Sequence, residues 1–518
     1  MNCRKMRSRK RSNACSGIEN SKKQKPDSMR SPALRDLEHL AKDHKGEVYL
    51  VGGVLRDQAL GDCSAVHDID LAISGSAKNF AQRVAQKLKG TLIVLHAETR
   101  IYRIAAKTLQ VDVAQIQGAS IDEDLARRDF TINAMAAKFP IKDEDLIDPF
   151  NGRRDAKRKI LRATGPRVFS EDPLRMLRAF RLAATLGLKI EAATRERIHR
   201  HRKKIATPAG ERIRTELLGI LRADNSAAHL RAMDACGLLT AVFPELEKSR
   251  CCAEVYYGKG GVLKHSLAVV ERADQLIANL ADIYPAWGDK FKNDLANGLS
   301  ANANPQVLVR LACLLHDVSK PACAKMIKGR LRFFGHEAQG AVLSVEILKR
   351  LRFSSEEIET VRLCIHHHLR PGNLAASGVV SDKAVFRFFR DLGDHGVRLL
   401  AVCWADHASY LGPNALRAIL PRIAEDPHTS DRSRPRSQEA RKTLFHLQIV
   451  SYLLNQWINR RDHVRPRKIL DGTEIMKTLK IPAGPAVGNA LAALLEAQAE
   501  GKVKNRSDAL RFLKKLKQ

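Results

Sequence analysis

The spacing of apolar residues changes once along this chain, near residue 150, and this change limits the fold more than any other feature. After about residue 155, apolar residues recur almost throughout at helical spacing. Before it, a helical pattern covers Ala77–Leu88, among short strand-like segments. The expected strands are Val48–Val51, Ile69–Ile73, Leu92–Leu95, Ile101–Ala105 and Val111–Ala114. We therefore predict an α+β protein, with a small α/β head followed by all-helical domains.

The length of 518 residues leaves room for roughly three or four domains. The head is expected at residues 36–150, opening with a helix at 36–45. A helical neck and body at 151–250 and a second helical domain at 255–425 should follow. A polar, Pro-containing linker at 426–443 and a helical tail at 444–518 complete the predicted organisation.

Basic residues outnumber acidic ones by 89 to 57, which gives a net charge of +32. Such an excess indicates a polyanionic partner, most simply a nucleic acid. Residues 1–35 carry a net +9 and are expected to be a disordered basic leader; a transit peptide, or a natural start at Met29, are the alternatives. Residues 150–214 carry a net +13 within a folded pattern. We expect a cluster in this segment to contact RNA phosphates, namely Arg200, Arg202, Lys203 and Lys204.

Composition excludes several classes of protein. No run of about 18 uncharged apolar residues occurs, which excludes an integral membrane protein. Apolar residues make up 44% of the chain, which excludes wholesale disorder. The ten cysteines show no CxxC pattern, as is typical of free thiols in a reducing compartment, and we expect the cytoplasm. The sequence makes no prediction about the oligomeric state.

A glycine pair in the head indicates phosphate binding. Gly52 and Gly53 follow an expected strand and open a helix. Paired glycines let the backbone approach a phosphate, and the first N–H groups of a helix attract one. Arg56 lies one turn further on and can add a bidentate contact.

Acidic residues on two of the strands indicate a metal site. Asp68 and Asp70 are two positions apart along one expected strand. Because successive side chains of a strand point to opposite faces, these two share a face. Two such carboxylates repel each other unless a cation lies between them, and their hard oxygen atoms suit Mg²⁺. Asp112, within an apolar strand, is a candidate third carboxylate.

Longer motifs occur around these residues in a fixed order. They are Val51–Asp57, Asp68–Asp70, Arg127–Ala134, Asp148–Asp155 and Glu171–Arg178. Together they resemble the class II tRNA nucleotidyltransferases and bacterial poly(A) polymerases, within the DNA-polymerase-β-like nucleotidyltransferases. The resemblance covers about residues 45–250 and implies a template-independent enzyme that adds C residues, A residues or both, from CTP and ATP, to the 3′ end of tRNA, as in CCA addition or repair.

The resemblance also implies a role for individual side chains. Asp68 and Asp70 would hold the catalytic Mg²⁺ ions. Asp172 and Arg175 would read the edge of the base, from positions i and i+3 that share a helix face. On the residues alone, an intrahelical salt bridge is the alternative for this pair. The nucleotide-binding residues implied are Gly52, Gly53, Arg56, Arg128, Asp129, Asn133, Asp172, Arg175 and Arg178.

One departure from the family pattern concerns the complete CCA activity. Family members that add C, C and A carry a flexible charged loop between the Asp68–Asp70 motif and the Arg127–Asp129 motif. Recognisable strands and Ile121–Asp124 occupy most of that interval here. A partial enzyme that adds only CC or only A, and a poly(A) polymerase, are therefore alternatives to full CCA addition.

A second series of residues suggests another metal site. Histidines and aspartates occur in the order H, HD, H, HH and D across about residues 265–406. Imidazoles and carboxylates together suit Mn, Fe, Ni, Zn or Mg. The series resembles the HD metal-dependent phosphohydrolase superfamily. That resemblance implies a ligand set of His265, His316, Asp317, His336, His367 and Asp406, and phosphate or cyclic phosphate groups at RNA ends as substrates.

Two further functions compete with nucleotide addition on the sequence. The HD domain could be the main activity, with the head as an RNA anchor. The chain could also be a non-catalytic RNA-binding factor, although the intact acidic motifs argue against this. A C-terminal segment, Ile469–Gly488, resembles the RNA-binding tail of HD-bearing nucleotidyltransferases.

Overall fold

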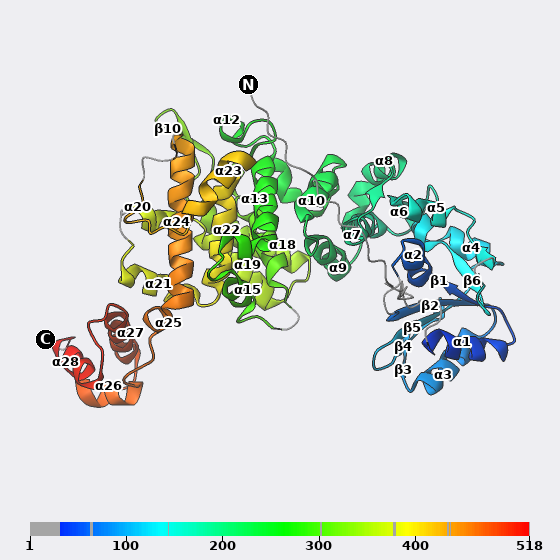
Figure 1. Ribbon diagram of the computed structural model, residues 1–518, viewed down its shortest axis with the longest axis horizontal. Helices are drawn as coiled ribbons and strands as arrows, with labels where there is room; N and C mark the ends of the chain where they lie inside the picture. The colour runs from blue at the N-terminus through cyan, green and yellow to red at the C-terminus, as the bar shows by residue number, and fades with distance from the viewer. Residues whose placement is uncertain are drawn as a thin grey trace, which may run out of the picture. The chain divides into compact units, whose positions relative to one another are not determined.

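The computed structural model describes residues 32–62, 66–142, 145–300, 303–376, 380–431, 435 and 437–516. The chain forms two compact units, residues 1–159 and 160–518 (Figure 1). The first unit extends past residue 150, where the head was expected to end, because α5 (Gly152–Lys157) packs on helices of the head. Most of the basic leader lies outside the described residues, and its last four residues begin α1 (Pro32–Lys42).

The first unit is built on a seven-stranded sheet in the order β3-β4-β5-β2-β1-β6-β7. The strands β2 and β5 are parallel, and the other neighbouring pairs are antiparallel. All five expected strands are confirmed to within one residue at each end. Two short strands were not predicted, because three and two residues are too few to show alternation. The bounds are β1 (Val48–Val51), β2 (Asp68–Ile73), β3 (Thr91–His96), β4 (Ile101–Ala105), β5 (Gln110–Gln115), β6 (Ala136–Lys138) and β7 (Leu146–Ile147).

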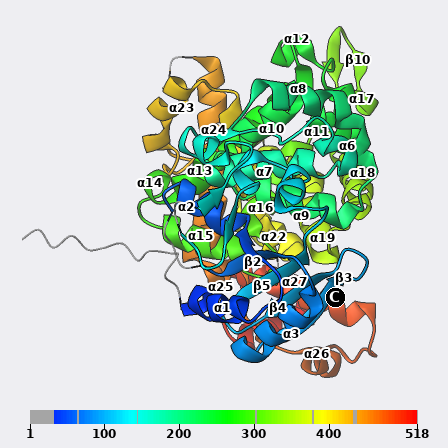
Figure 2. The ribbon, with the colours of Figure 1, turned by 90° about the vertical axis from the view of Figure 1, so that its right-hand side faces the viewer.

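The two faces of this sheet bury different side chains. Leu50 and Phe80 belong to the larger core, beneath α1 and α3 (Ala77–Leu88) (Figure 1; Figure 2). Tyr49 and Val51 alternate with Leu50 and pack with α4 (Ile121–Ala126) on the opposite face. The expected helix at 77–88 is confirmed. The remaining short helices of this unit are α2 (Gly53–Ala59) and η2 (Thr131–Asn133).

The second unit is almost wholly helical, which confirms the α+β prediction. Its first part corresponds to the expected neck and body. It comprises α6 (Val168–Glu171), α7 (Arg175–Leu186), α8 (Ala192–His201), η4 (Arg202–Ala206), α9 (Gly210–Leu221), α10 (Ser226–Ala235), α11 (Leu238–Val242) and η5 (Pro244–Ser249), with a small ladder of β8 (Ile160–Leu161) and β9 (Lys189–Ile190).

The central part of this unit surrounds the buried helices α13, α16 and α22. No helix among the described residues is long and apolar enough to cross a membrane. The elements are α12 (Glu254–Tyr257), α13 (Gly261–Ala278), α14 (Leu280–Ile283), α15 (Gly288–Ala296), α16 (Pro305–Leu315), α17 (Lys320–Cys323), β10 (Lys325–Ile327), β11 (Arg330–Arg332), α18 (His336–Arg350), α19 (Ser355–His367), α20 (Arg370–Ala376), α21 (Asp382–Leu392), α22 (His395–Ser409), α23 (Pro413–Ile419) and η6 (Leu420–Arg422).

The C-terminal part begins with a long helix and ends in a small helical cluster with its own apolar core. The expected linker at 426–443 lies partly outside the described residues, and its last six residues are helical. The elements are α24 (Gln438–Asn459), α25 (Arg461–Val464), α26 (Gly472–Leu479), α27 (Pro485–Ala499) and α28 (Arg506–Leu516). The division of the chain into six parts stays a prediction.

A buried ion pair joins α13 and α16 in the core of the second unit. Arg310 is fully buried, and its Nε lies 2.6 Å from Oδ1 of Asp274. Removing one partner leaves the other charge buried without compensation. We expect Arg310→Met to lower the free energy of unfolding of this unit by about 3–5 kcal/mol. Urea unfolding followed by circular dichroism measures this, and the Arg310→Met/Asp274→Leu double variant should recover most of the loss. A single variant as stable as the wild type would contradict the expectation.

Candidate functional site

The glycine pair at the end of β1 lets the backbone lie against Asp70, one of the predicted catalytic carboxylates. Gly52 has a φ of +74°, a conformation that side chains rarely adopt. A Cβ atom at Gly52 would lie 2.7 Å from Oδ2 of Asp70. The N–H of Gly53 donates a hydrogen bond to the same carboxylate. The pair therefore positions Asp70, and phosphate binding by this turn stays a prediction.

We expect Gly52→Ala to reduce nucleotide addition by about 100-fold, because a displacement of about 1 Å at a reacting group is enough for such a loss. The matched control is Gly61→Ala, since Gly61 also has a positive φ, +83°, but nothing lies within 4 Å of the Cβ position. Both variants should lose similar stability from backbone strain. Initial-rate assays with labelled nucleotide compare the rate of addition by the two variants. An equal loss in both variants would assign the effect to strain alone.

The three predicted carboxylates lie on one face of the sheet. Asp70 pairs with Asp112 across the parallel strands β2 and β5, and Asp68 lies two residues before Asp70. Burial raises the pKa of Asp70, the nearby guanidinium of Arg128 opposes this rise, and Asp112 adds to it. The carboxylate of Asp112 accepts two hydrogen bonds from Arg103, at 2.8 and 2.7 Å. The structure thus brings all three carboxylates together, with Asp112 already neutralised by Arg103.

Three of the predicted nucleotide-binding residues of the head, Arg56, Asn133 and Asp129, are joined by hydrogen bonds. Nη1 of Arg56 donates to Oδ1 of Asn133 at 3.3 Å. Nδ2 of Asn133 donates in turn to Oδ1 of Asp129 at 3.0 Å. Arg128 pairs with Asp124 at 3.1 Å and acts on the pKa of Asp70. These polar side chains can hold a triphosphate and a ribose, and Asp124 is a member that the sequence argument did not single out.

The structure corrects the expectation that Asp172 and Arg175 share a face of one helix, while their role in reading the base stays a prediction. Asp172 lies between two helices, with extended backbone, whereas Arg175 is the first residue of α7. The two residues therefore do not share a helix face. Oδ1 of Asp172 accepts a hydrogen bond from the backbone N–H of Leu174 at 3.1 Å, and Oδ2 pairs with Arg212 at 3.2 Å. Proline at position 173, which cannot continue a helix from Asp172, is the local signal for this break.

Arg178, the third neck residue of the predicted set, shares a buried partner with another arginine. Its Nε lies 3.2 Å from Oε1 of Glu216, while Nε of Arg181 lies 2.5 Å from Oε2. Glu216 is buried on α9. Arg178 is therefore held by the carboxylate of Glu216. This contact was not predicted, because Arg178 and Glu216 are 38 positions apart in the sequence.

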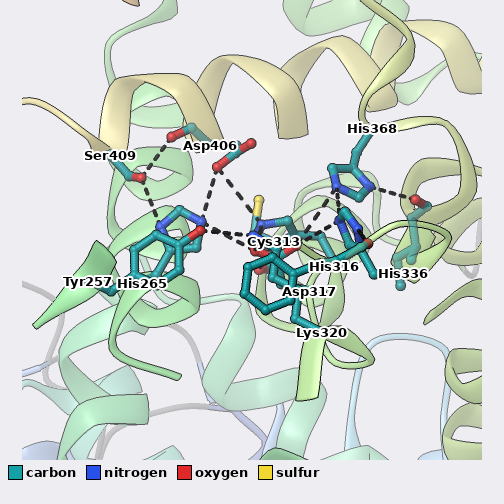
Figure 3. Close-up of polar contacts among 12 residues, drawn as sticks. Tyr257, His265, Cys313, His316, Asp317, Lys320, His336, His368, Asp406 and Ser409 are labelled. Carbon is teal, nitrogen blue, oxygen red and sulfur yellow. Dashed lines mark hydrogen bonds and ion pairs between the residues drawn. The ribbon is translucent and has the colours of Figure 1, made fainter. Parts of the chain in front are cut away.

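A second constellation, in the second unit, gathers histidines and aspartates from five elements. The HD cluster, as we call it, has Asp317 at its centre. Nε2 of His316 lies 3.1 Å from Oδ2 of Asp317, and Nε2 of His336 lies 3.3 Å from Oδ1 (Figure 3). Nε2 of His265 lies 3.2 Å from Oδ1 of Asp406. All the members are buried. The cluster consists of His265, His316, Asp317, His336, His368 and Asp406.

The structure places His368 in this cluster, which corrects the expectation for His367. Nε2 of His368 lies 3.2 Å from Nε2 of His336 and 3.8 Å from Oδ1 of Asp317. His367 is half-buried and lies against the ring of His366, with centroids 4.6 Å apart. Consecutive helical residues point about 100° apart, so the orientation of α19 decides which histidine of the three enters the cluster.

Burial and close charges set the protonation of the cluster. Burial by itself would raise the pKa of Asp317, but His316 and Lys320 hold it well below its usual range. Burial lowers the pKa of His368 to about 4, so this imidazole is neutral at pH 7. Lys320 is a member of the site that the sequence argument missed. Its Nζ lies 2.5 Å from Oδ2 of Asp317 and donates to the hydroxyl of Tyr257 at 2.8 Å.

The donor atoms of the cluster fit a divalent metal. Two groups have ligand atoms within 4.8 Å of one another: His265, His316 and Asp317, and Asp317, His336 and His368. Oδ2 of Asp317 is paired with Lys320. In the described part of the chain, other buried atoms of the cluster lie near one another without a hydrogen-bond partner, namely His265 Nε2, His316 Nε2, Asp317 Oδ1 and Asp406 Oδ1. Buried polar atoms without partners are costly, and a bound cation would satisfy those of His265, His316 and Asp317.

The predicted RNA-contacting cluster lies on α8 and η4. Arg200, Lys203 and Lys204 are exposed, and Arg200 pairs with Glu196 at 3.1 Å. Arg202 is half-buried, and its Nη1 donates to the backbone oxygen of His199 at 2.5 Å. Arg202 thus supports the local backbone, whereas both lysines extend into solvent.

Three family models match successive parts of the chain. The family described as "Poly A polymerase head domain" matches residues 48–162. The family described as "Probable RNA and SrmB-binding site of polymerase A" matches residues 187–249. The family described as "HD domain" matches residues 262–411.

Relatives of known activity match almost end to end. The chain is 29% identical over 484 residues to the A-adding tRNA nucleotidyltransferase of Deinococcus radiodurans, covering 90% of this chain and 94% of the relative. It is 30% identical over 478 residues to the CC-adding tRNA nucleotidyltransferase of Thermus thermophilus, covering 90% and 93%. Among solved structures, a CCA-adding enzyme with CTP shares the fold, with a TM-score of 0.63, 20% identity and coverage of 94% and 96%. The Thermotoga maritima CCA-adding enzyme with tRNA has a TM-score of 0.60, 21% identity and coverage of 94% and 96%. The head motifs, the helical body and the match to the Thermus relative together show that this chain belongs to the tRNA nucleotidyltransferase family.

Proposed function

We propose that the chain adds C residues, and not the terminal A, to the 3′ end of tRNA. The observation that carries this proposal is the shortness of every connection between Asp70 and Arg127. The longest of them, residues 116–120 between β5 and α4, has five residues. The flexible loop expected of a family member that adds all three nucleotides has no room there. Short connections favour a partial enzyme but do not distinguish addition of C from addition of A. The relatives favour C, since three that match 90% of the chain are CC-adding enzymes and one is an A-adding enzyme.

In this reaction the 3′-hydroxyl of the tRNA attacks the α-phosphorus of CTP, and pyrophosphate leaves. Mg²⁺ bound by Asp68 and Asp70 would supply charge stabilisation for the attacking and leaving oxygens. The turn at Gly52 and Gly53 would let the backbone approach the triphosphate, and Arg56 would add positive charge. The protein's task is chiefly positioning and charge stabilisation, because phosphoryl transfer needs little covalent chemistry from side chains.

The experiment that tests this proposal uses three RNA substrates and one labelled nucleotide at a time. The substrates are tRNA lacking CCA, tRNA ending in CC, and an oligo(A) primer. We expect two C residues on the first substrate and no extension of the second with ATP. Addition of a single A to tRNA ending in CC would show an A-adding enzyme, addition of both C and A would show full CCA activity, and a ladder on oligo(A) would show a poly(A) polymerase.

We propose a second activity for the HD cluster, hydrolysis of phosphate or cyclic phosphate groups at RNA ends. The unpartnered atoms of the cluster, together with the two groups of close ligand atoms, support it. The residues of the cluster would hold a divalent metal, which would activate water for attack on phosphorus. Lys320, positively charged and buried beside Asp317, is placed to neutralise charge on a phosphate oxygen. Which metal occupies the cluster, whether Mn, Ni, Fe, Zn or Mg, is decided by metal analysis of the purified protein.

Neutralising Arg200, Arg202, Lys203 and Lys204 should weaken tRNA binding and flatten its dependence on salt. Each phosphate contact contributes about 0.7–0.9 to the slope of log affinity against log salt concentration. Since the two lysines are exposed and Arg202 is engaged with His199, Lys203→Gln/Lys204→Gln should account for most of the change. Filter binding at several salt concentrations measures the slope. An unchanged slope would show that these side chains are only a solvated surface.

We further propose that the protein acts in the cytoplasm. The seven cysteines in the described part of the chain are all free thiols, as expected for a reducing compartment.

A further inference from the structure

A groove of about 1100 Å³ opens beside the HD cluster. Its inner wall includes His336, a member of the cluster, and Lys320 and Tyr257, which contact the cluster. Ligand pockets in proteins are commonly about 300–1000 Å³. The groove therefore has space for a group much larger than the phosphate at which the cluster would act.

The outer wall of the groove exposes large apolar and aromatic side chains. Phe334 is 75% exposed, Met326 68% and Tyr256 52%. The hydroxyl of Tyr256 donates to the backbone oxygen of Leu331 at 2.9 Å, which ties α12 to the hairpin of β10 and β11; both ribbon views show α12 beside β10 (Figure 1; Figure 2). Exposed aromatic rings gathered along a groove mark a binding surface. Ring faces of this kind are the usual platform for an unpaired nucleobase.

The hairpin also carries positive charge to the same groove. Its turn at Lys328 and Gly329 has positive φ at both residues, +48° and +71°, as in the tight two-residue loops that hold a hairpin rigid. Arg330 and Arg332 line the groove, and both side chains are exposed. Glu337 is the one acidic side chain among the groove-lining residues. The groove thus combines aromatic faces with guanidinium groups, next to a cluster suited to phosphate chemistry.

We propose that this groove binds the terminal nucleotides of a single-stranded RNA end, for hydrolysis at the HD cluster. The terminal base stacks on Phe334 and Tyr256, and Arg330 and Arg332 hold a neighbouring backbone phosphate. The terminal phosphate then reaches Lys320 and the cluster. Only an unpaired base exposes its faces for stacking, which favours a single-stranded end over a duplex. This proposal rests on the proposed hydrolase activity of the HD cluster and makes the hairpin its specificity-determining element.

A photo-crosslinking experiment tests the groove without requiring hydrolysis. The full-length protein is irradiated with a short single-stranded RNA that ends in 5-bromouridine and a 3′-phosphate, and adducts are located by mass spectrometry. We expect adducts at Phe334 or Tyr256, and loss of these adducts in Arg330→Gln/Arg332→Gln. The matched control is Val342→Ala, because Val342 is an equally prominent apolar residue, 65% exposed, on α18 outside the groove. Adducts found elsewhere, with none in residues 254–257 or 326–337, would overturn the proposal.

A kinetic comparison separates the groove from the activity of the cluster. Phosphate release is measured from the same RNA and from glycerol 2-phosphate, which has no base. Phe334→Ala should lower kcat/KM for the RNA by about 5–100-fold, mainly through KM, because one base stack is lost. Phe334→Ala should leave kcat/KM for glycerol 2-phosphate unchanged. Phe334→Tyr should retain the wild-type kcat/KM for the RNA, and Val342→Ala should change kcat/KM for neither substrate. An equal loss on both substrates would overturn the groove proposal. If the wild-type protein releases phosphate from neither substrate, the hydrolase proposal is refuted. The crosslinks alone would then test whether the groove binds RNA.

Discussion

Replacing Asp70 by alanine is expected to reduce nucleotide addition by about 1000-fold or more while tRNA binding survives. Asp70 accepts the N–H of Gly53, faces Arg128 and pairs in register with Asp112. It is thus the carboxylate most enclosed by the predicted nucleotide-binding residues. A bound metal contributes several kcal/mol of charge stabilisation in the transition state, and each 1.36 kcal/mol corresponds to tenfold in rate.

The measurement is single-turnover addition of labelled CTP to tRNA lacking CCA, with tRNA affinity determined in parallel. Asp68→Ala should behave in the same way. The control is Asp145→Ala, an exposed aspartate of the same unit, which should retain wild-type rates. Wild-type-like incorporation by the Asp70 or Asp68 variant would refute the assignment of these residues to the metals.

The second large effect is expected at Asp317. Asp317→Ala removes the one residue that belongs to both groups of close ligand atoms in the HD cluster. Hydrolysis of RNA-end phosphates should fall by more than about 100-fold. Even residues that only hydrogen-bond to metal ligands change metal affinity or activity by about 10–100-fold, and a direct ligand should matter more. The metal content of the purified protein should fall with it. The rate of CTP addition should stay unchanged, since Asp68, Asp70 and their network belong to a different compact unit.

The control for this variant is Asp282→Asn, an exposed aspartate on α14 of the same unit. Metal analysis after dialysis and thermal unfolding are measured alongside activity, so that a folding defect is recognised. Full phosphate release by Asp317→Ala would exclude the cluster as the hydrolytic site. Phosphate release that survives Asp70→Ala but disappears in Asp317→Ala would show that the two activities are independent.

Local patterns in the sequence predicted much of the head. The predicted bounds of the five strands agree with the observed bounds to within one residue, and those of the helix Ala77–Leu88 agree at both ends. The agreement arises because alternation and helical spacing are short-range properties. Alternation also placed Asp68 and Asp70 on one face, and both residues do lie in the strand β2. The short strands β6 and β7 were missed, since they form only by pairing with β1 and with each other.

Contacts between distant residues escaped prediction for a different reason. Arg103 neutralises Asp112 from the neighbouring strand, and Glu216 holds Arg178 from another helix. Nothing in the residues around Asp112 or Arg178 identifies these partners. Asp172 shows the same limit, because its partner Arg212 lies 40 positions away, on α9.

The sequence by itself therefore determined the kinds of residue available for chemistry: paired carboxylates after a glycine turn, and an ordered series of histidines and aspartates. These follow from motif order and from the geometry of single strands and helices. The tertiary structure alone decided that His368 enters the HD cluster in place of His367, and that Lys320 pairs with Asp317. The physical reason is that the choice among three consecutive histidines depends on how α19 is rotated against α16 and α22, and that rotation is set by core packing between segments far apart in the chain.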